Sequence, residues 1–331
     1  MSESKKIAVL GGGSWATAIV KMLCNNVEQL HWWIRREETV DYINKYHRNP
    51  NYLGSVKLDG NIVLPSTDIN AVVDAADIII LAVPSAFLKG ALENLTVDLK
   101  DKMVFSAIKG IVPQENMIVG DFLYEVYKLP IEQIGVITGP CHAEEVALER
   151  LSYLTVSSQN LEMAQLLADN LSCRYIKCNV SEDIYGTEYA AVLKNVVALA
   201  AGICHGVGYG DNFQAVLISN AIREIKRFVD KAHPIDRDIN ESAYLGDLLV
   251  TAYSQFSRNR TFGNMIGQGY SVRSAQLEMN MVAEGYYATA CLKEINQEMQ
   301  VDMPILEMVY NIVYEKISPR IETALLADKL N

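Results

Sequence analysis

A single lysine stands inside an apolar stretch, AAVLKNVVALAAG, at residues 190–202. If the stretch is helical, the neighbours of Lys194 three and four positions away are three alanines and a valine. One interpretation is a snorkelling lysine, whose stem crosses the apolar face while its ammonium reaches water. The other is a desolvated lysine with a lowered pKa, which can exchange protons near neutral pH. This stretch alone favours the snorkelling interpretation, so the rest of the chain must decide.

Two further segments carry polar groups at spacings that suit catalysis or binding. LGDLLVT places Asp247 and Thr251 four residues apart, on one face of a helix. The alternative there is a capping aspartate and a threonine bonded to its own backbone. SRNRTFG at 257–263 supplies a hydroxyl, two guanidinium groups and a carboxamide, which suits a phosphate monoester. Its alternative is a solvated charged turn.

The N-terminal segment has the pattern of a dinucleotide-binding turn. KKIAVL predicts a strand, and GGGSWATAIVKML predicts a glycine turn followed by a helix. Gly11 permits the tight turn, Gly13 lets the backbone approach a pyrophosphate, and Ala16 is small enough for helix–strand packing. A helix that begins near Ser14 would offer unpaired N–H groups to the phosphates.

Apolar strands must position this turn. They are predicted at residues 5–10, 29–34, 77–83, 102–108, 134–138 and 153–157. Because helical segments separate most of them, they indicate a doubly wound parallel sheet, with ligands beyond the carboxyl ends of its strands. Four of these ends carry polar or turn-forming residues, which makes a site there the favoured interpretation: Arg35-Arg36, Pro84-Ser85, Lys109-Gly110 and Gly139-Pro140.

The strand signals stop at about Ser181. Helical patterns take over at residues 183–203, 212–230, 241–256, 273–300 and 304–316. We therefore expect a Rossmann-like domain at residues 1–180, followed by an all-helical substrate and catalytic domain at 181–331.

Composition narrows the class of protein. The formal charge of −11 over 331 residues argues against a nucleic-acid-binding surface. The opening MSESKK lacks the apolar stretch of a signal peptide, and runs such as residues 78–83 are too short to cross a bilayer. Six cysteines without zinc-like spacing predict free thiols in a reducing cytoplasm and no metal site. We expect a cytoplasmic protein without stable membrane insertion.

Taken together, the motifs resemble the NAD(P)-dependent glycerol-3-phosphate dehydrogenase family of the bacterial type, over essentially the whole chain. The similar segments are GGGSWATA, LAVPS, IKGI, GPCHAEEVA, LKNVVALAAGICHGVGYGDN, LGDLLVT, SRNRTFG and VAEGYYA. Two residues depart from the family pattern. Cys141 replaces a usual serine or threonine, which would weaken a substrate hydrogen bond, and Tyr244 replaces a small residue, which implies local repacking.

The resemblance implies reduction of dihydroxyacetone phosphate to sn-glycerol 3-phosphate, which supplies glycerophospholipid synthesis, by a protein that commonly forms a homodimer. Lys194 would be the proton donor and acceptor, and Asp247 and Thr251 would orient it. The implied cofactor-binding residues are Gly11, Gly13, Ser14, Trp15, Arg35, Arg36, Lys109, Ala143, Arg258, Val282 and Glu284. The implied substrate-binding residues are Lys109, Gly139, Cys141, Lys194, Asn195, Asp247, Ser257, Arg258 and Asn259.

The residues after the second strand bear on the choice of cofactor. An enzyme strict for NAD would usually place an acid there for the ribose 2′-hydroxyl. Arg35 and Arg36 occupy this place, and a guanidinium can bind a 2′-phosphate instead. We therefore expect NADPH to be accepted and preferred over NADH. In the alternative, the arginines are only solvated and Glu37 reaches the ribose.

Two other functions remain open. A related lysine-dependent 3-hydroxyacid or sugar-acid dehydrogenase would share the architecture, but it would not need the polar cluster at residues 257–260. A non-catalytic protein that senses the dinucleotide would need no proton-transfer residue.

Overall fold

The computed structural model describes residues 5–279 and 283–331, and the chain forms two compact units. Unit 1 comprises Met1–Ile108 and Val119–Ile184, and unit 2 comprises Lys109–Ile118 and Tyr185–Asn331. A single boundary after residue 180 therefore misplaces the segment Lys109–Ile118. This segment belongs to unit 2 because Ile111 and Ile118 are buried in the apolar core of that unit.

Among the described residues of unit 1, one sheet has eight strands, in the order β10-β9-β8-β5-β4-β1-β2-β3. The central strands β1 and β4 are completely buried, as expected for a sheet with helices on both faces. The strands are β1 Ile7–Leu10, β2 Leu30–Trp33, β3 Val63–Ser66, β4 Ile78–Leu81, β5 Met103–Ser106, β8 Ile134–Thr138, β9 Ser152–Ser158 and β10 Ile176–Ser181.

The doubly wound architecture is confirmed, with one correction to the sheet. All neighbouring strands are parallel except β8 and β9, which pair antiparallel. The chain between them contains only the short helix α6 (Ala143–Ala147), whereas a parallel pair needs a longer crossover connection. Strands β3 and β10 were not predicted from the sequence. These are the two edge strands, and their exposed and half-buried residues give no continuous apolar run.

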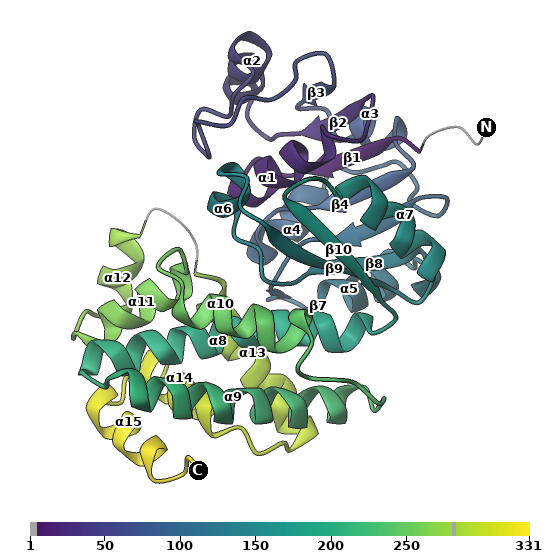
Figure 1. Cartoon of the computed structure of the whole chain (residues 1–331). Coiled ribbons are helices and arrows are strands. Elements are labelled where there is room, and N and C mark those ends of the chain that lie inside the picture. The colour runs from purple at the N-terminus through teal and green to yellow at the C-terminus, as the bar shows by residue number, and fades with distance from the viewer. Residues whose placement is uncertain (1–4, 280–282) are drawn as a thin grey trace. The chain divides into compact units, whose positions relative to one another are not determined.

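The helices of unit 1 flank this sheet (Figure 1). Helix α1 contacts α6 and α7, and α5 contacts β8. Their bounds, with the 3₁₀ turn η1, are α1 Ser14–Leu23, α2 Glu37–Tyr46, α3 Ile69–Asp74, α4 Ser85–Leu92, α5 Val119–Glu125, η1 Ile131–Gln133 and α7 Leu161–Leu171.

The order of the strands fixes where a ligand can bind. From β1 the chain runs to β2 and β3 on one side of the sheet, whereas β4 and β5 lie on the other side. The point of reversal is between β1 and β4, and Gly11 directly follows β1 there. Crevices for ligands in open α/β sheets lie at such a point, beyond the carboxyl ends of the strands.

Unit 2 is mainly helical. Its elements are the hairpin β6 Ile111–Val112 and β7 Met117–Ile118, the π-helical turn η2 Ser242–Gly246, and the helices α8 Ile184–Val207, α9 Asp211–Ala232, α10 Asp247–Tyr253, α11 Arg258–Gly267, α12 Val272–Glu278, α13 Glu284–Met299, α14 Pro304–Val313 and α15 Pro319–Ala327. The predicted helix at 273–300 is thus two helices, and α15 was not predicted. The hairpin departs from the expected all-helical composition.

Helix α8 runs through the middle of unit 2 (Figure 1). By its length and composition this helix could cross a bilayer. The sequence-based expectation considered only short continuous apolar runs and did not include it. However, 83% of its most apolar window is buried inside the protein, as in a core helix. Helix α8 therefore places Lys194 in the interior.

Helices α8 and α11 touch through their backbones. A Cβ on Gly202 of α8 would lie 2.1 Å from the carbonyl oxygen of Arg260, and a Cβ on Gly263 of α11 would lie 2.1 Å from that of Leu199. Only glycine fits at these two positions, because a side chain would force the helices apart. This contact fixes the separation of the helix that carries Lys194 from the helix that begins at Arg258.

Candidate active site

The glycine turn of unit 1 has the geometry that its sequence predicts. Gly11 has a φ of +134°, and a Cβ on it would lie 2.4 Å from the carbonyl oxygen of Ala82 at the end of β4. No side chain fits there. Gly13 precedes α1, and a Cβ on it would meet nothing within 4 Å. The open side of Gly13 therefore leaves room for a ligand to approach the backbone.

Each of the three glycine carbonyl oxygens accepts a hydrogen bond from a side chain of unit 1. The Trp32 indole donates to the oxygen of Gly11 at 2.6 Å. The Asn49 amide donates to the oxygen of Gly12 at 3.1 Å. The Thr17 hydroxyl donates to the oxygen of Gly13 at 2.9 Å. All three carbonyl groups are thus held on the protein side of the turn.

The amide groups of the turn are left for a ligand. In a trans peptide the C=O and the following N–H point in opposite directions, so inward carbonyls direct the next N–H groups outward. The backbone N–H groups of Gly12, Gly13 and Ser14 meet no acceptor in the part of the chain that the structure describes, and all three residues are partly exposed. Successive outward N–H groups at a helix start bind anions, so these residues fit a pyrophosphate.

The two arginines after β2 lie beside this turn. The Gly11 N–H donates to the carbonyl oxygen of Trp33 at 3.0 Å, which holds the end of β2 against the turn. Arg35 and Arg36 follow two and three residues later and are exposed. The Arg36 guanidinium lies 4.0 Å from the Glu38 carboxylate, a contact between largely exposed groups that contributes little.

The other predicted site residues of unit 1 pack against other parts of the same unit. The Trp15 indole donates to the carbonyl oxygen of Ala107 at 3.0 Å, which ties α1 to the chain after β5. Gly139 has a φ of +104°, and a Cβ on it would lie 3.0 Å from the carbonyl oxygen of Tyr153. Cys141 and Ala143 are buried in the apolar core of unit 1.

Unit 2 contains a buried centre of two lysines and one carboxylate. Lys194 of α8 donates to Oδ1 of Asp247, at the start of α10, and Lys109 Nζ lies 3.0 Å from Oδ2 of the same carboxylate. The side chain of Asp247 is 1% exposed and that of Lys194 is 6% exposed. The snorkelling interpretation of Lys194 is therefore wrong, because its ammonium meets a buried carboxylate instead of water.

Burial and the neighbouring opposite charges have opposing effects on the pKa values of Lys194 and Asp247. Burial lowers the pKa of Lys194 to about 7, because desolvation and the neighbouring Lys109 charge outweigh the attraction of Asp247. Burial would raise the pKa of Asp247, but the charges of Lys109 and Lys194 outweigh it and lower that pKa instead. The carboxylate therefore stays ionised while Lys194 gains or loses its proton near neutral pH. This is the behaviour required of a group that is both general acid and general base.

Thr251 forms a hydrogen bond with the backbone of Asp247. Its hydroxyl donates to the carbonyl oxygen of Asp247 at 2.7 Å. The alternative interpretation, a threonine bonded to its own helix backbone, is therefore correct for Thr251. The carboxylate of Asp247, in contrast, pairs with Lys109 and Lys194. The π-helical turn η2, which contains the buried Tyr244, directly precedes Asp247. Such wide turns occur frequently at functional sites.

Two asparagines of unit 2 are oriented by backbone groups. The Asn195 amide donates to the carbonyl oxygen of Lys109 at 2.7 Å, and Asn259 Oδ1 accepts the N–H of Gly285 at 2.9 Å. Because a backbone N–H can only donate, the accepting atom of Asn259 must be oxygen, and its NH₂ group points the other way. A Cβ on Gly285 would lie 2.5 Å from the Asn195 carbonyl oxygen, so only glycine fits.

The segment 257–263 forms the start of α11 and is not a charged turn. The Ser257 hydroxyl caps this helix by accepting the N–H of Arg260 at 3.3 Å. Arg258 is exposed and Asn259 is buried in its first turn, where the helix favours anions. Glu284 begins α13. Val282, an implied cofactor contact, lies outside the described residues.

Comparison with known proteins identifies the family. Residues 6–164 match the model of the NAD-dependent glycerol-3-phosphate dehydrogenase N-terminus, and residues 183–323 match that of its C-terminus. The chain is 36% identical to a glycerol-3-phosphate dehydrogenase [NAD(P)+] of Bacillus pumilus, over 96% of this chain and 93% of the relative. The chain belongs to the NAD(P)-dependent glycerol-3-phosphate dehydrogenase family.

Other glycerol-3-phosphate dehydrogenases agree with this assignment. The protein of Staphylococcus carnosus is 33% identical, over 94% of each chain. A crystal structure of the protein of Coxiella burnetii matches with a TM-score of 0.89 at 26% identity, over 98% of this chain and 99% of the other. A D-mandelate dehydrogenase with NADH has a TM-score of 0.60 at 18% identity, which shows a shared fold alone.

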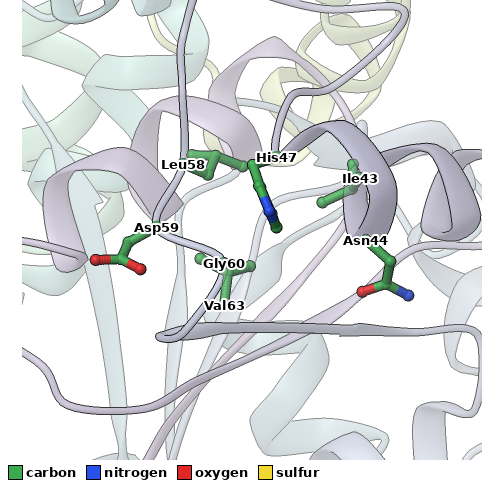
Figure 2. Close-up of a pocket in the computed structure, with 7 residues that line it drawn as sticks. All are labelled: Ile43, Asn44, His47, Leu58, Asp59, Gly60 and Val63. Atoms are coloured by element: carbon green, nitrogen blue, oxygen red, sulfur yellow. The ribbon is translucent and has the colours of Figure 1, made fainter.

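The small pocket in Figure 2 lies at the end of α2, and no sequence-predicted site residue lines it. A Cβ on Gly60 would come within 2.2 Å of the His47 ring, so the imidazole already packs on the glycine backbone. Its lining residues are Ile43, Asn44, His47, Leu58, Asp59, Gly60 and Val63.

Several residues that shape the site were not predicted from the sequence. Thr17, Trp32 and Asn49 hold the glycine turn, and Gly285 orients Asn259. The only local signal for Asn49 is its position before Pro50, which is typical of a turn. Nothing in the spacing connects it with a glycine turn 37 residues earlier.

Proposed function

We propose that this chain catalyses the reversible NAD(P)H-dependent reduction of dihydroxyacetone phosphate to sn-glycerol 3-phosphate, with Lys194 as the proton donor and acceptor. The observation that carries the proposal is the buried centre in which Asp247 binds both Lys194 and Lys109. Relatives that bear the name of this activity are 33–36% identical over nearly the whole chain, which supports the reaction itself.

The residues of unit 2 account for the proton transfer. When bound, the reduced nicotinamide supplies a hydride for the substrate carbonyl carbon. The Lys194 ammonium stabilises the negative charge that develops on the carbonyl oxygen and donates the proton. In the oxidation direction the neutral amine accepts the hydroxyl proton. Asp247 holds Nζ of Lys194 in place, and the charge of Lys109 helps to keep the pKa of Lys194 low enough for both roles.

The start of α11 is the proposed phosphate site. The NH₂ group of Asn259 is turned away from Gly285 and remains available as a donor, and the Arg258 guanidinium adds a bidentate donor with a positive charge. Asn195 is placed near this segment by Lys109 and Gly285. A carboxylate-specific dehydrogenase would not need these donors, so they favour a phosphorylated substrate.

Replacing Arg258 with alanine should lower kcat/KM for dihydroxyacetone phosphate about ten- to hundredfold, because a charge-assisted hydrogen bond contributes roughly 1.5–3 kcal/mol. Dihydroxyacetone without the phosphate should be a poor substrate of the wild type and should lose little more in the variant. Steady-state kinetics with both substrates make this comparison. If the variant used the phosphorylated substrate normally, the phosphate site would lie elsewhere.

Replacing Arg35 with alanine should raise the KM for NADPH much more than the KM for NADH. We propose that the Arg35 guanidinium binds the 2′-phosphate, which NADH lacks, and that the wild type prefers NADPH. Each cofactor serves as the control for the other in the same variant. Equal losses with both would show that Arg35 does not recognise the 2′-phosphate, and use of NADH alone would reject the preference for NADPH.

Three further properties belong to the same proposal. The product would supply glycerophospholipid synthesis, the protein would act in the cytoplasm without membrane insertion, and it would form a homodimer. Sedimentation equilibrium of the purified protein tests the dimer, since a monomer would have a mass of 36.8 kDa.

Turnover by the purified protein distinguishes this function from its alternatives. Oxidation of NADPH or NADH in the presence of dihydroxyacetone phosphate, but not of unphosphorylated 3-oxoacids, is expected. A related 3-hydroxyacid or sugar-acid dehydrogenase would give the opposite result. A dinucleotide sensor would bind the cofactor without turnover of any of these substrates.

A further inference from the structure

We propose that Asn49 is a positioning residue for the dinucleotide, because its amide holds the peptide between Gly12 and Gly13 in the orientation that binds phosphate. The inference rests on the proposed binding of NAD(P)H at the glycine turn. It assigns a role to a residue outside the nucleotide-binding motif, in the loop that follows α2.

Every hydrogen-bonding group of the Asn49 side chain is used. Nδ2 donates to the Gly12 carbonyl oxygen at 3.1 Å and to the Thr17 hydroxyl at 2.9 Å. Oδ1 accepts the backbone N–H groups of Asn51 at 3.0 Å and Tyr52 at 3.2 Å. Those two backbone donors identify the oxygen and therefore the direction of the NH₂ group. The residue is 1% exposed, so loss of any of these bonds would leave a buried polar group unsatisfied.

The bonds of Asn49 act on two successive peptides of the turn. Holding the Gly12 carbonyl inward directs the Gly13 N–H outward, because the two groups of one peptide are antiparallel. The Thr17 hydroxyl, which accepts from Asn49, donates in turn to the Gly13 carbonyl, which directs the Ser14 N–H outward. Asn49 thus orients the Gly13 N–H directly, and it supports the Thr17 hydroxyl, which shares the Gly13 carbonyl oxygen with the backbone N–H of Thr17.

The loop that carries Asn49 is itself fixed. The neighbouring Arg48 donates to the carbonyl oxygens of Gly54 and Ser55, both at 3.0 Å. The N–H of Leu58 donates to the carbonyl oxygen of His47 at 2.9 Å, and the side chain of Leu58 is buried in the core of unit 1. The amide of Asn49 is therefore presented to the turn by a rigid support, as required of a group that preorganises a binding site.

Replacement of Asn49 by aspartate tests the inference with almost no change of shape. The aspartate can still accept from Asn51 and Tyr52, but it presents an oxygen to the Gly12 carbonyl oxygen where the wild type presents an N–H. Asn49→Ala removes the group without adding charge and serves as the second variant. Asn51→Asp places the same new charge two residues away on an exposed side chain of the same loop and is the matched control.

The probe is ADP-ribose, which contains the pyrophosphate but no nicotinamide, and its Kd is measured by calorimetry on the folded proteins. Loss of a correctly directed charge-assisted hydrogen bond predicts a Kd about ten- to hundredfold higher for both Asn49 variants and an unchanged Kd for Asn51→Asp. The KM for NADPH should rise in parallel, while kcat at saturating cofactor stays near the wild-type value.

The remaining outcomes decide against the inference. Wild-type affinity for ADP-ribose in both Asn49 variants would overturn it. A fall in kcat equal to the loss of ADP-ribose affinity, with a lowered Tm, would mean that Asn49 only supports the fold, and would overturn it as well. If the wild type itself bound neither ADP-ribose nor NADPH, the proposed nucleotide site would fail first, which distinguishes the two failures.

Discussion

Replacing Lys194 with methionine is expected to lower kcat for reduction of dihydroxyacetone phosphate by at least ~10²-fold, the usual scale of general acid–base catalysis. Methionine keeps an unbranched stem of similar length among the buried alanines and valines of α8 but carries no proton to donate. The affinity for NADPH should remain near that of the wild type, because the glycine turn belongs to unit 1. Stopped-flow absorbance of the nicotinamide measures both quantities.

A matched control for this variant is Lys293→Met. Lys293 also pairs with a carboxylate in unit 2, that of Glu307, but its side chain is 30% exposed. The control should retain kcat, since it removes a lysine from a partly exposed ion pair. Near-normal turnover by Lys194→Met would reject the catalytic role of Lys194, even though the snorkelling interpretation fails on geometry.

Replacing Asp247 with asparagine is expected to damage both stability and catalysis. The change leaves Lys109 and Lys194 close together without their shared carboxylate, and breaking a buried ion pair in this way costs roughly 3–5 kcal/mol. The pKa of Lys194 should fall further, because Asp247 is the group that raises it. At neutral pH less Lys194 would be protonated, so reduction should lose more activity at pH about 8 than at pH about 6.

The control for stability is Asp302→Asn. The Asp302 side chain is 85% exposed, and its carboxylate lies 3.7 Å from Arg227, so this pair should contribute at most about 1 kcal/mol. Thermal unfolding and pH-dependent kinetics of both variants make the comparison. A Tm of Asp247→Asn equal to that of Asp302→Asn, with normal kcat across the pH range, would contradict the role assigned to the buried centre.

Much of the fold could be predicted because its signals are local. Central strands such as Ile78–Leu81 are continuous apolar runs, and the turn from Gly11 to Gly13 lies between a strand and a helix. The antiparallel pairing of β9 could not be predicted, because it depends on how the chain returns after β8. The place of Lys109–Ile118 in unit 2 depends on two isoleucines that meet a core formed by residues far along the chain.

The candidate site was less accessible to sequence reasoning than the fold. The apolar neighbours of Lys194 indicate that it could be buried, but they do not tell whether its ammonium reaches water. That question is decided by Asp247, which lies 53 residues away in sequence. The roles of Asp247 and Lys109 came from the family resemblance and not from spacing. Asn49 and Gly285 act through hydrogen bonds with segments that are distant in sequence. A single sequence contains no signal for such pairings.

The pH dependence of kcat for reduction of dihydroxyacetone phosphate by NADPH, from pH about 5.5 to about 9, tests the central claim most directly. Only protonated Lys194 can donate, and its pKa is lowered to about 7. Reduction should therefore slow as pH rises through about 7, and oxidation of glycerol 3-phosphate should accelerate over the same range. No turnover of this substrate, or a kcat for reduction that stays constant up to pH about 9, would contradict the account.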